Sequence, residues 1–215
     1  MFDYEEIIYF DTETTGLKYY TDTITELAYY IETEKNAHDK YISIPDNQHY
    51  STEVIDVTGI TREFLKLNGE NKETVMTEFY NKIYEKENTL LIAHNISFDV
   101  SFIKTEFEKL GLKWKKIDVL DTLTVFKDMA PYPHKLKDAI QYFNIKGVQN
   151  SHKAIDDVMA LKAVTESMVS INQNVSNYIN LIGYNPKYGY DQINLEYCKY
   201  LPQKYNSKRP LYYCY

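Results

Sequence analysis

The sequence predicts an α/β fold, in which a β-sheet is flanked by helices, and three observations lead to this prediction. The first 45 residues contain three runs of β-branched, aromatic and other apolar residues, separated by polar, turn-forming stretches. Residues 89–93 form a short, fully apolar run, which is typical of a central strand buried on both faces. Several later segments repeat apolar residues at helical spacing, and the last of them extends to about residue 170.

The elements follow from these patterns in chain order. Strands are expected at 5–11, about 22–32 and 41–44, and their succession with intervening turns predicts an antiparallel meander. The remaining elements are a helix beginning at a Ser51 cap, a helix at about 72–86, the strand at 89–93, a helix capped by Ser97 and ending at Gly111, a strand near 117–120, a helix at about 121–129, a short helix around 136–143 and a helix from about 151 to 170.

The last helix carries an acidic residue on its apolar face. Asp157, Leu161, Val164 and Met168 recur at helical spacing and form one stripe that must face the sheet. An unpaired acid on a buried face is costly, so Asp157 needs a cation or strong hydrogen-bonding partners. In a continuous helix His152 would lie about 140° around the axis from Asp157, so it can work beside Asp157 only from the loop before the helix.

Composition excludes several classes of protein. The net charge of −7 argues against a protein that coats nucleic acid nonspecifically, but not against an enzyme that grips a few phosphates through metal ions. The two cysteines, Cys198 and Cys214, have no metal-ligand spacing and predict no disulfide framework. No run is long enough to span a membrane and the acidic start is unlike a signal peptide, so we expect a cytoplasmic protein.

The chain changes character after about residue 171, where Asn, Tyr, Gly and Pro dominate and no clear period survives. We therefore expect one domain over residues 1–182, followed by a Tyr-rich C-terminal appendage at 183–215 that packs on the domain or on a partner.

Four acids stand at the ends of predicted elements. Asp11 and Glu13 follow the first strand at i and i+2, so they point to the same face. Asp99 falls in the first helical turn after the buried strand, and Asp157 lies near the start of the last helix. Paired carboxylates favour a hard divalent cation such as Mg²⁺ or Mn²⁺ between them. Alone, Asp11 and Glu13 would also be compatible with a solvated strand end.

Three segments, in this order, resemble the DEDDh family of 3′–5′ exonucleases, which contains the epsilon proofreading subunit of bacterial DNA polymerase III. The matching stretches are Asp11-Thr-Glu13-Thr-Thr-Gly-Leu, His94-Asn95-x-x-Phe98-Asp99 and His152-Lys-Ala-x-x-Asp157, within residues 5–170. The resemblance implies an RNase H-like fold, with a mixed five-stranded sheet flanked by helices. It also implies that Asp11, Glu13, Asp99 and Asp157 bind two Mg²⁺ or Mn²⁺ ions, with Glu13 counted among the catalytic residues and His152 as the general base.

The same resemblance implies a set of substrate-binding residues. Thr14, Gly16 and Leu17 would line the terminal nucleotide, with Leu17 as a wedge against the last base. His94, Asn95 and Phe98 would shape the entry of the strand, although His94 and Phe98 also suit purely structural roles. The stretch from Val57 to Thr61 is similar to the family's His-Gly-Ile-Thr stretch, except that Thr58 stands in place of the His.

The resemblance therefore implies a metal-dependent 3′–5′ exonuclease that releases nucleoside monophosphates from the 3′ ends of single-stranded DNA in proofreading or repair. One alternative is an RNA-trimming exonuclease, because contacts to a 2′-OH are invisible in a sequence. Another is a non-catalytic, nuclease-like module that docks a polymerase or a sliding clamp. For the last case, Gln192-Ile-Asn-Leu195-Glu-Tyr197 is similar to short clamp-binding peptides.

Overall fold

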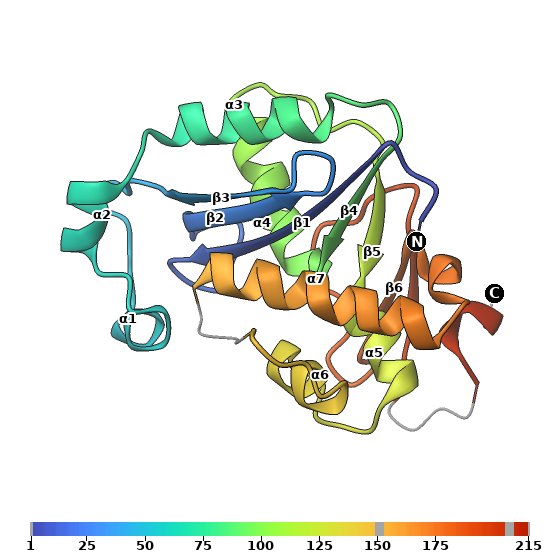
Figure 1. The fold of residues 1–215 in the computed structure, drawn as a ribbon. Helices are drawn as coiled ribbons and strands as arrows, with labels where there is room; N and C mark the ends of the chain where they lie inside the picture. Colours follow the sequence, from blue (N-terminus) through green and yellow to red (C-terminus); the bar gives the residue numbers. More distant parts are fainter. Residues whose placement is uncertain (1, 149–152, 205–208, 215) are drawn as a thin grey trace.

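The computed structural model of the chain describes residues 2–148, 153–204 and 209–214. Its centre is a five-stranded sheet in the order β3-β2-β1-β4-β5 (Figure 1). The strands are β1 (Glu6–Thr14), β2 (Ile24–Ile31), β3 (Asn36–Tyr41), β4 (Thr89–Ala93) and β5 (Asp118–Asp121). The helices are α1 (Thr52–Thr58), α2 (Arg62–Asn68), α3 (Lys72–Ile83), α4 (Ile96–Lys109), α5 (Thr122–Met129), α6 (Leu136–Tyr142) and α7 (Ala154–Ile171).

The sheet is mixed. β2 runs antiparallel to both β1 and β3, whereas β4 runs parallel to both β1 and β5. This is the helix-flanked, mixed five-stranded sheet of an RNase H-like fold, so the predicted fold class is confirmed.

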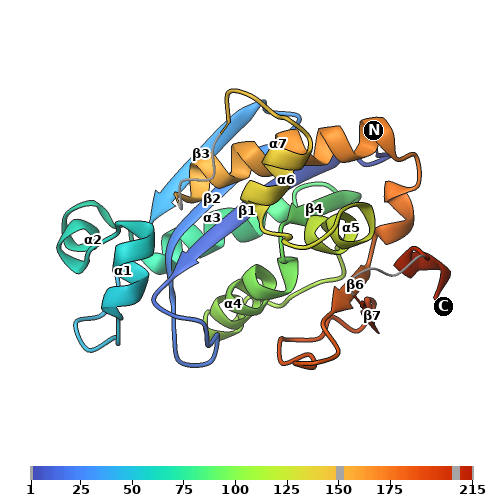
Figure 2. The ribbon, with the colours of Figure 1, turned by 90° about the horizontal axis from the view of Figure 1, so that it is seen from below.

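Helices cover both faces of the sheet. Successive residues of a strand point to opposite sides, so one strand contributes apolar side chains to both faces. In β1, Ile8 and Phe10 belong to a core formed with α3 and α4, whereas Ile7 and Tyr9 belong to a second core formed with α5, α6 and α7. Figure 2 shows α7 and α4 on opposite sides of the sheet. Every residue of β4 is buried, as expected for a parallel strand between two helical layers.

The structure corrects several predicted boundaries. The third strand ends at Tyr41 instead of beginning there, and Ile42 forms an isolated bridge with Glu70. The cap of α4 is Asn95 in the left-handed conformation, not Ser97, which lies inside the helix. A left-handed residue can turn the chain sharply from β4 into α4, which the sequence pattern alone does not reveal.

The C-terminal segment is built into the domain. A 3₁₀ turn (Val175–Tyr178) leads to β6 (Leu181–Tyr184), which pairs in parallel with β7 (Lys199–Pro202), and a second 3₁₀ turn covers Leu211–Tyr213. Asn180 pairs with β5, since its N–H donates to the Val119 carbonyl at 2.8 Å and its Oδ1 accepts from the Val119 N–H at 3.0 Å. Leu195 belongs to the core beside α4, and Leu211 belongs to the core beside α7.

The clamp-like peptide is part of this segment. Leu195 is buried, and the hydroxyl of Tyr197 accepts a hydrogen bond from Trp114 Nε1 at 3.0 Å. The two residues that would have to insert into a partner are therefore engaged with the domain.

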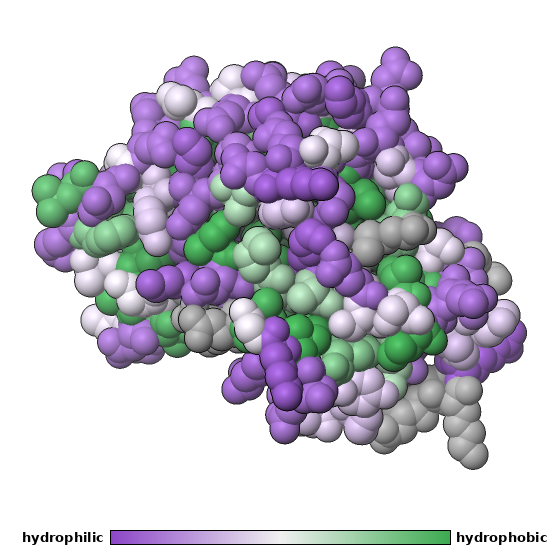
Figure 3. All heavy atoms as spheres, viewed as in Figure 1, coloured by the Kyte–Doolittle hydropathy of each residue, from purple (hydrophilic) through white to green (hydrophobic). Residues whose placement is uncertain are grey.

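The surface is mixed in character, and the helices bear on whether the chain could span a membrane. On the face shown in Figure 3, hydrophilic side chains predominate over α3, and apolar patches lie lower and at the tip formed by α2. Within the described ranges, no helix combines the length and the apolar character that a membrane span requires.

Candidate metal centre and adjoining pocket

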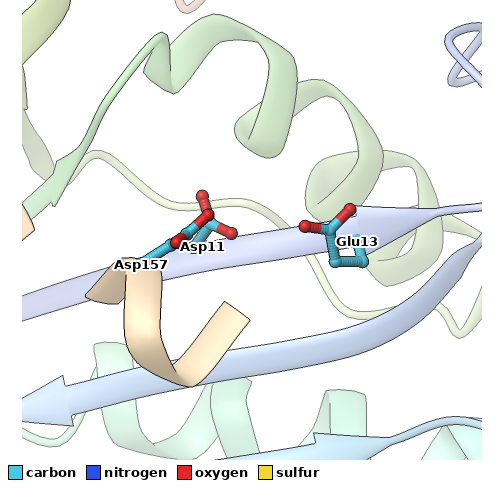
Figure 4. Close-up of side chains that lie close together, drawn as sticks. All are labelled: Asp11, Glu13 and Asp157. Carbon is cyan, nitrogen blue, oxygen red and sulfur yellow. The ribbon is translucent and has the colours of Figure 1, made fainter. Parts of the chain in front are cut away.

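Three carboxylates from two elements converge beside the sheet. Asp11 and Glu13 project from β1, and Asp157 projects from the first turn of α7 (Figure 4). One carboxylate oxygen of each residue lies within 4.8 Å of the corresponding oxygens of the other two. The structure thus brings together three of the four acids predicted as metal ligands.

The geometry of β1 explains why Asp11 and Glu13 share this face. The strand continues to Thr14, three residues beyond the predicted end, so both acids lie within the strand at i and i+2. The pairing with β2 is shifted between Glu13 and Thr14. A bulge of this kind re-aims side chains next to functional sites, and here it separates the acids from the loop that follows.

The start of α7 is held against the sheet by a buried glutamate. Glu26 of β2 is the pairing partner of Glu13, and its Oε1 accepts a hydrogen bond from the N–H of Ala154 at 3.2 Å. The helix then buries Asp157, Leu161, Val164 and Met168, which confirms the predicted stripe. The helix begins at Ala154, later than the predicted start near 151, and His152 lies outside the described residues.

Negative charge is concentrated where these carboxylates meet. Burial and the charges of four neighbouring carboxylates, those of Asp99, Glu13, Asp157 and Glu26, raise the pKa of Asp11 well above its usual range. Burial, with the charges of Asp157 and Asp99, raises the pKa of Glu13 to about 8. Among the described residues, no lysine or arginine forms an ion pair with Asp11 or Glu13.

Asp99 occupies the first turn of α4, as predicted, but lies outside the group of three. Its Oδ1 accepts hydrogen bonds from the N–H of Thr12 at 3.0 Å and from the Thr12 hydroxyl at 2.7 Å. Burial raises the pKa of Asp99 to about 7, although the hydrogen bonds from Thr12 lower it. Its charge contributes to the raised pKa values of Asp11 and Glu13, so it lies near the same centre.

The donor set fits a hard divalent cation. The three converging groups offer only carboxylate oxygens, which Mg²⁺ and Mn²⁺ prefer over softer metals. A cation there would offset the repulsion among these carboxylates. The cluster can therefore bind metal, and the identity and number of the ions belong to the proposal below.

A pocket of about 680 Å³ adjoins the acids. Glu13 forms part of its wall, and four of the six residues predicted to bind substrate line it: Thr14, Gly16, Leu17 and Phe98. The side chain of Leu17 is 77% exposed at this pocket. A Cβ at Gly16 would lie 2.5 Å from a carboxylate oxygen of Asp22, so a larger residue here would displace the Asp22 side chain, which accepts a hydrogen bond from the Lys18 N–H at 2.8 Å.

The other two predicted residues do not line this pocket. The His94 ring is engaged on both nitrogens, at 3.0 Å from the Thr122 hydroxyl and 2.9 Å from the His134 carbonyl oxygen. Burial lowers the pKa of His94, so the ring is neutral at physiological pH. Asn95 is exposed and acts through its backbone as the cap of α4. A substrate role for His94 and Asn95 stays a prediction.

Most of one pocket wall was not predicted from the sequence. α1 and the residue before it contribute Ser51, Glu53, Val54, Val57 and Thr58 to the lining, and the preceding loop contributes His49. The sequence singled out Ser51 only as a helix cap, and Val57 and Thr58 only within the stretch that resembles the family's His-Gly-Ile-Thr. The available signal was the pair of apolar residues Val54 and Val57, one helical turn apart; in the structure Val57 is 55% exposed.

Comparison with known families and proteins agrees with this geometry. The model of the RNase T family, described as an exonuclease family, matches residues 8–165. The PolC-type DNA polymerase III of Listeria innocua is 36% identical over 154 residues, which is 70% of this chain and 10% of that protein. The corresponding protein of Halalkalibacterium halodurans is 35% identical over 158 residues, 72% of this chain and 11% of its own length. The chain thus spans about a tenth of the length of these curated relatives.

Solved structures show the same fold. A zinc-bound complex of Escherichia coli exonuclease I with single-stranded DNA superposes with a TM-score of 0.69 at 18% identity, covering 82% of this chain and 43% of that one. The complex of the same enzyme with a dA16 oligonucleotide gives a TM-score of 0.67 at 19% identity, covering 80% and 42%. At these identities the similarity establishes the fold alone.

Proposed function

The chain belongs to the RNase T/DEDDh exonuclease family, as the sequence resemblance predicted, and on this premise we propose that it is a metal-dependent 3′–5′ exonuclease. Its substrate would be the 3′ end of single-stranded DNA, from which it would release nucleoside monophosphates in proofreading or repair. The observation that carries the proposal is the convergence of Asp11, Glu13 and Asp157 beside a pocket whose wall includes Glu13.

Each group has a role in this proposal. Asp11, Glu13 and Asp157, with Asp99 beside them, would hold two Mg²⁺ or Mn²⁺ ions. Such ions stabilise both the attacking and the leaving oxygen of a phosphodiester. His152, at the family position, would act as the general base that takes the proton of the attacking water.

The pocket suits a nucleotide that is held by its base and its terminal phosphate. Leu17, Val57 and Phe98 offer apolar surface to a base, and Glu13 of the three-acid cluster lines the same pocket. Among the described lining residues, Lys18 is the only lysine or arginine, so the phosphate charge would be met mainly by the metal ions.

Support for DNA as the substrate comes from the relatives. The similar curated proteins are DNA polymerases, and the exonuclease I structures contain single-stranded DNA. The same relatives support our proposal of a proofreading setting with a polymerase partner, and a cytoplasmic location would accompany it. Docking to a sliding clamp through Leu195 and Tyr197 would first require these residues to leave their sites in the domain.

The test is hydrolysis of matched single-stranded DNA and RNA oligonucleotides, labelled at the 5′ or the 3′ end. We expect stepwise shortening of 5′-labelled DNA and release of a labelled mononucleotide from 3′-labelled DNA, with Mg²⁺ or Mn²⁺ and not with EDTA. Preference for the RNA would assign the chain to RNA trimming. No cleavage of either with either metal would contradict the enzyme and favour the docking module.

A further inference from the structure

Asp121 is a buried carboxylate outside the three-acid cluster. It ends β5, pairs with Ala93 at the end of β4, and is only 3% exposed. Its Oδ1 accepts hydrogen bonds from the N–H groups of Asn95 at 2.8 Å, Ile96 at 3.3 Å and Leu123 at 3.2 Å. Its Oδ2 accepts from the Thr124 hydroxyl at 2.6 Å. All four donors lie in the first turns of two different helices or directly before them.

The hydrogen bonds to α4 replace a missing cap. Asn95 is the cap residue of α4 but has φ of 74°, and its side chain makes no capping hydrogen bond. The first N–H groups of a helix have no partner within the helix and need an acceptor. Asp121 supplies that acceptor from the neighbouring strand while it also caps its own helix, α5, through Leu123.

Asp99 lies on the turn that Asp121 holds. It comes four residues after Asn95, and its Oδ1 receives both hydrogen bonds from Thr12, the residue between Asp11 and Glu13. The place of the Asp99 carboxylate is thus fixed from two sides, by β1 through Thr12 and by β5 through Asp121.

We propose that Asp121 is a positioning residue of the metal centre, which sets the location of Asp99 by anchoring the first turn of α4. The inference rests on the proposed function. Groups that orient metal ligands typically change metal affinity or activity by about 10–100-fold when they are removed. Substrate binding should change little, because Phe98 is the only residue of α4 that lines the pocket.

The chain offers a matched control in Asp128, at the other end of α5. Its carboxylate also accepts several hydrogen bonds, from the Tyr178 hydroxyl at 2.8 Å, Gln203 Nε2 at 2.9 Å and the Leu211 N–H at 2.6 Å. These donors belong to the C-terminal segment and not to α4. Loss of Asp128 therefore removes a similar set of hydrogen bonds without touching the turn that carries Asp99.

The experiment compares Asp121→Ser and Asp121→Asn with Asp128→Ser and Asp128→Asn in the full chain. A serine still caps α5 but is too short to reach Asn95 and Ile96. An asparagine keeps an oxygen in place, as a weaker acceptor than a carboxylate. Mn²⁺ binding to metal-free protein is measured by calorimetry, and kcat and KM are measured on the single-stranded DNA, below the melting temperature of every variant.

We expect Asp121→Ser to weaken Mn²⁺ binding and lower kcat by about 10–100-fold with KM nearly unchanged, and Asp121→Asn to do the same to a smaller extent. Both Asp128 variants should melt earlier than wild type but keep its Mn²⁺ affinity and kcat. If Asp121→Ser does not fold, the comparison of Asp121→Asn with Asp128→Asn decides.

The inference is overturned if the Asp121 and Asp128 variants lose stability alike while the Asp121 variants keep wild-type Mn²⁺ affinity and kcat. A wild-type chain that binds Mn²⁺ without cleaving DNA would refute the proposed function, yet the calorimetric comparison would still decide this inference. A wild-type chain that does neither refutes both.

Discussion

Three carboxyl groups with a few ångströms between them are the most demanding feature of this molecule. Burial and mutual repulsion raise the pKa values of Asp11 and Glu13, which means that the folded, metal-free protein is stabilised by protons that these groups would otherwise release. A bound divalent cation reverses this balance, because it favours the ionised carboxylates. Stability and metal binding are therefore linked at the same residues.

Removal of one acid should weaken metal-dependent hydrolysis and at the same time stabilise the metal-free protein. Asp157→Ala is expected to lower the rate of DNA hydrolysis by more than about 100-fold, beyond the usual effect of groups that only orient ligands. The same change should raise the melting temperature of the metal-free protein at pH 8, since it removes a like charge from beside Glu13.

The control for this prediction is Asp156→Ala, which deletes the same charge one residue earlier, about 100° around the helix. It should retain hydrolysis. Calorimetry in EDTA and the oligonucleotide assay measure the two effects, and full activity of the Asp157 variant would disprove the metal-centre assignment.

Leu17 provides a second test at the scale of one side chain. It is 77% exposed at the pocket, so Leu17→Ala should leave the melting temperature unchanged. If a base packs on it, loss of roughly 1 kcal/mol of apolar contact should raise KM by about fivefold. Leu67→Ala is the matched control, because Leu67 on α2 is 85% exposed and does not line the pocket. Equal KM values for the two variants would remove Leu17 from the substrate site.

The elements themselves show which parts of the fold could be read from the sequence. The Asp157 stripe of α7 and the apolar β4 were predictable, because burial imposes a period on a regular element. The pocket wall formed by α1 was not predictable. Its few pocket residues face a space that exists only because another element, the loop after β1, lies opposite.

The sequence predicted that the C-terminal segment packs on the domain or on a partner, but not the strands and contacts it forms, for another physical reason. Its buried residues are isolated ones in irregular backbone, such as Leu195 and Leu211, so no period marks them. The side chains that hold it, including Asn180 and Gln203, are polar residues whose partners lie far away in the sequence. Local patterning carries no information about such contacts.

Truncation tests whether the predicted domain boundary at 182 separates an independent unit. A chain ending at Ile182 loses the burial of Leu195 and Leu211, each worth about 1.5–3 kcal/mol. We expect it to be less stable in urea by at least about 3 kcal/mol. A chain ending at Gln203 keeps Leu195 and β7, so its stability should lie between those of the full chain and the chain ending at Ile182. A chain ending at Ile182 with wild-type stability would establish 183–215 as a separable appendage.

For the whole molecule, the raised pKa values predict the direction of the pH dependence. Glu13 has a pKa of about 8 in the folded protein against an ordinary 4.5, and Asp99 about 7 against 3.8. At pH values between the unfolded and the folded pKa of each group, the folded protein binds more protons than the unfolded chain. The free energy of unfolding must therefore fall as pH rises from about 5 to 8.

In EDTA we expect the melting temperature to drop over this interval, by about 2–4 °C for each kcal/mol of stability lost in a protein of this size. Added Mg²⁺ or Mn²⁺ should restore most of the loss at pH 8 and have little effect at pH 5, where protons compete with the metal. Differential scanning calorimetry across this range provides the measurement, and a melting temperature that rises with pH in EDTA would contradict the assignment.

The pairing of Asn180 with β5 also bears on how the protein is made. The acids of the candidate site all precede Val158, whereas the partners that complete β5 and α5 come from Asn180 onward. A ribosome therefore releases the whole set of acids before it releases the residues that close both cores. Until synthesis has passed Leu211, the nascent chain carries its repelling carboxylates in an unfinished sheet, open to proteases and to chaperones. The order of translation thus delays completion of the folded candidate site until the residues that stabilise it have been made.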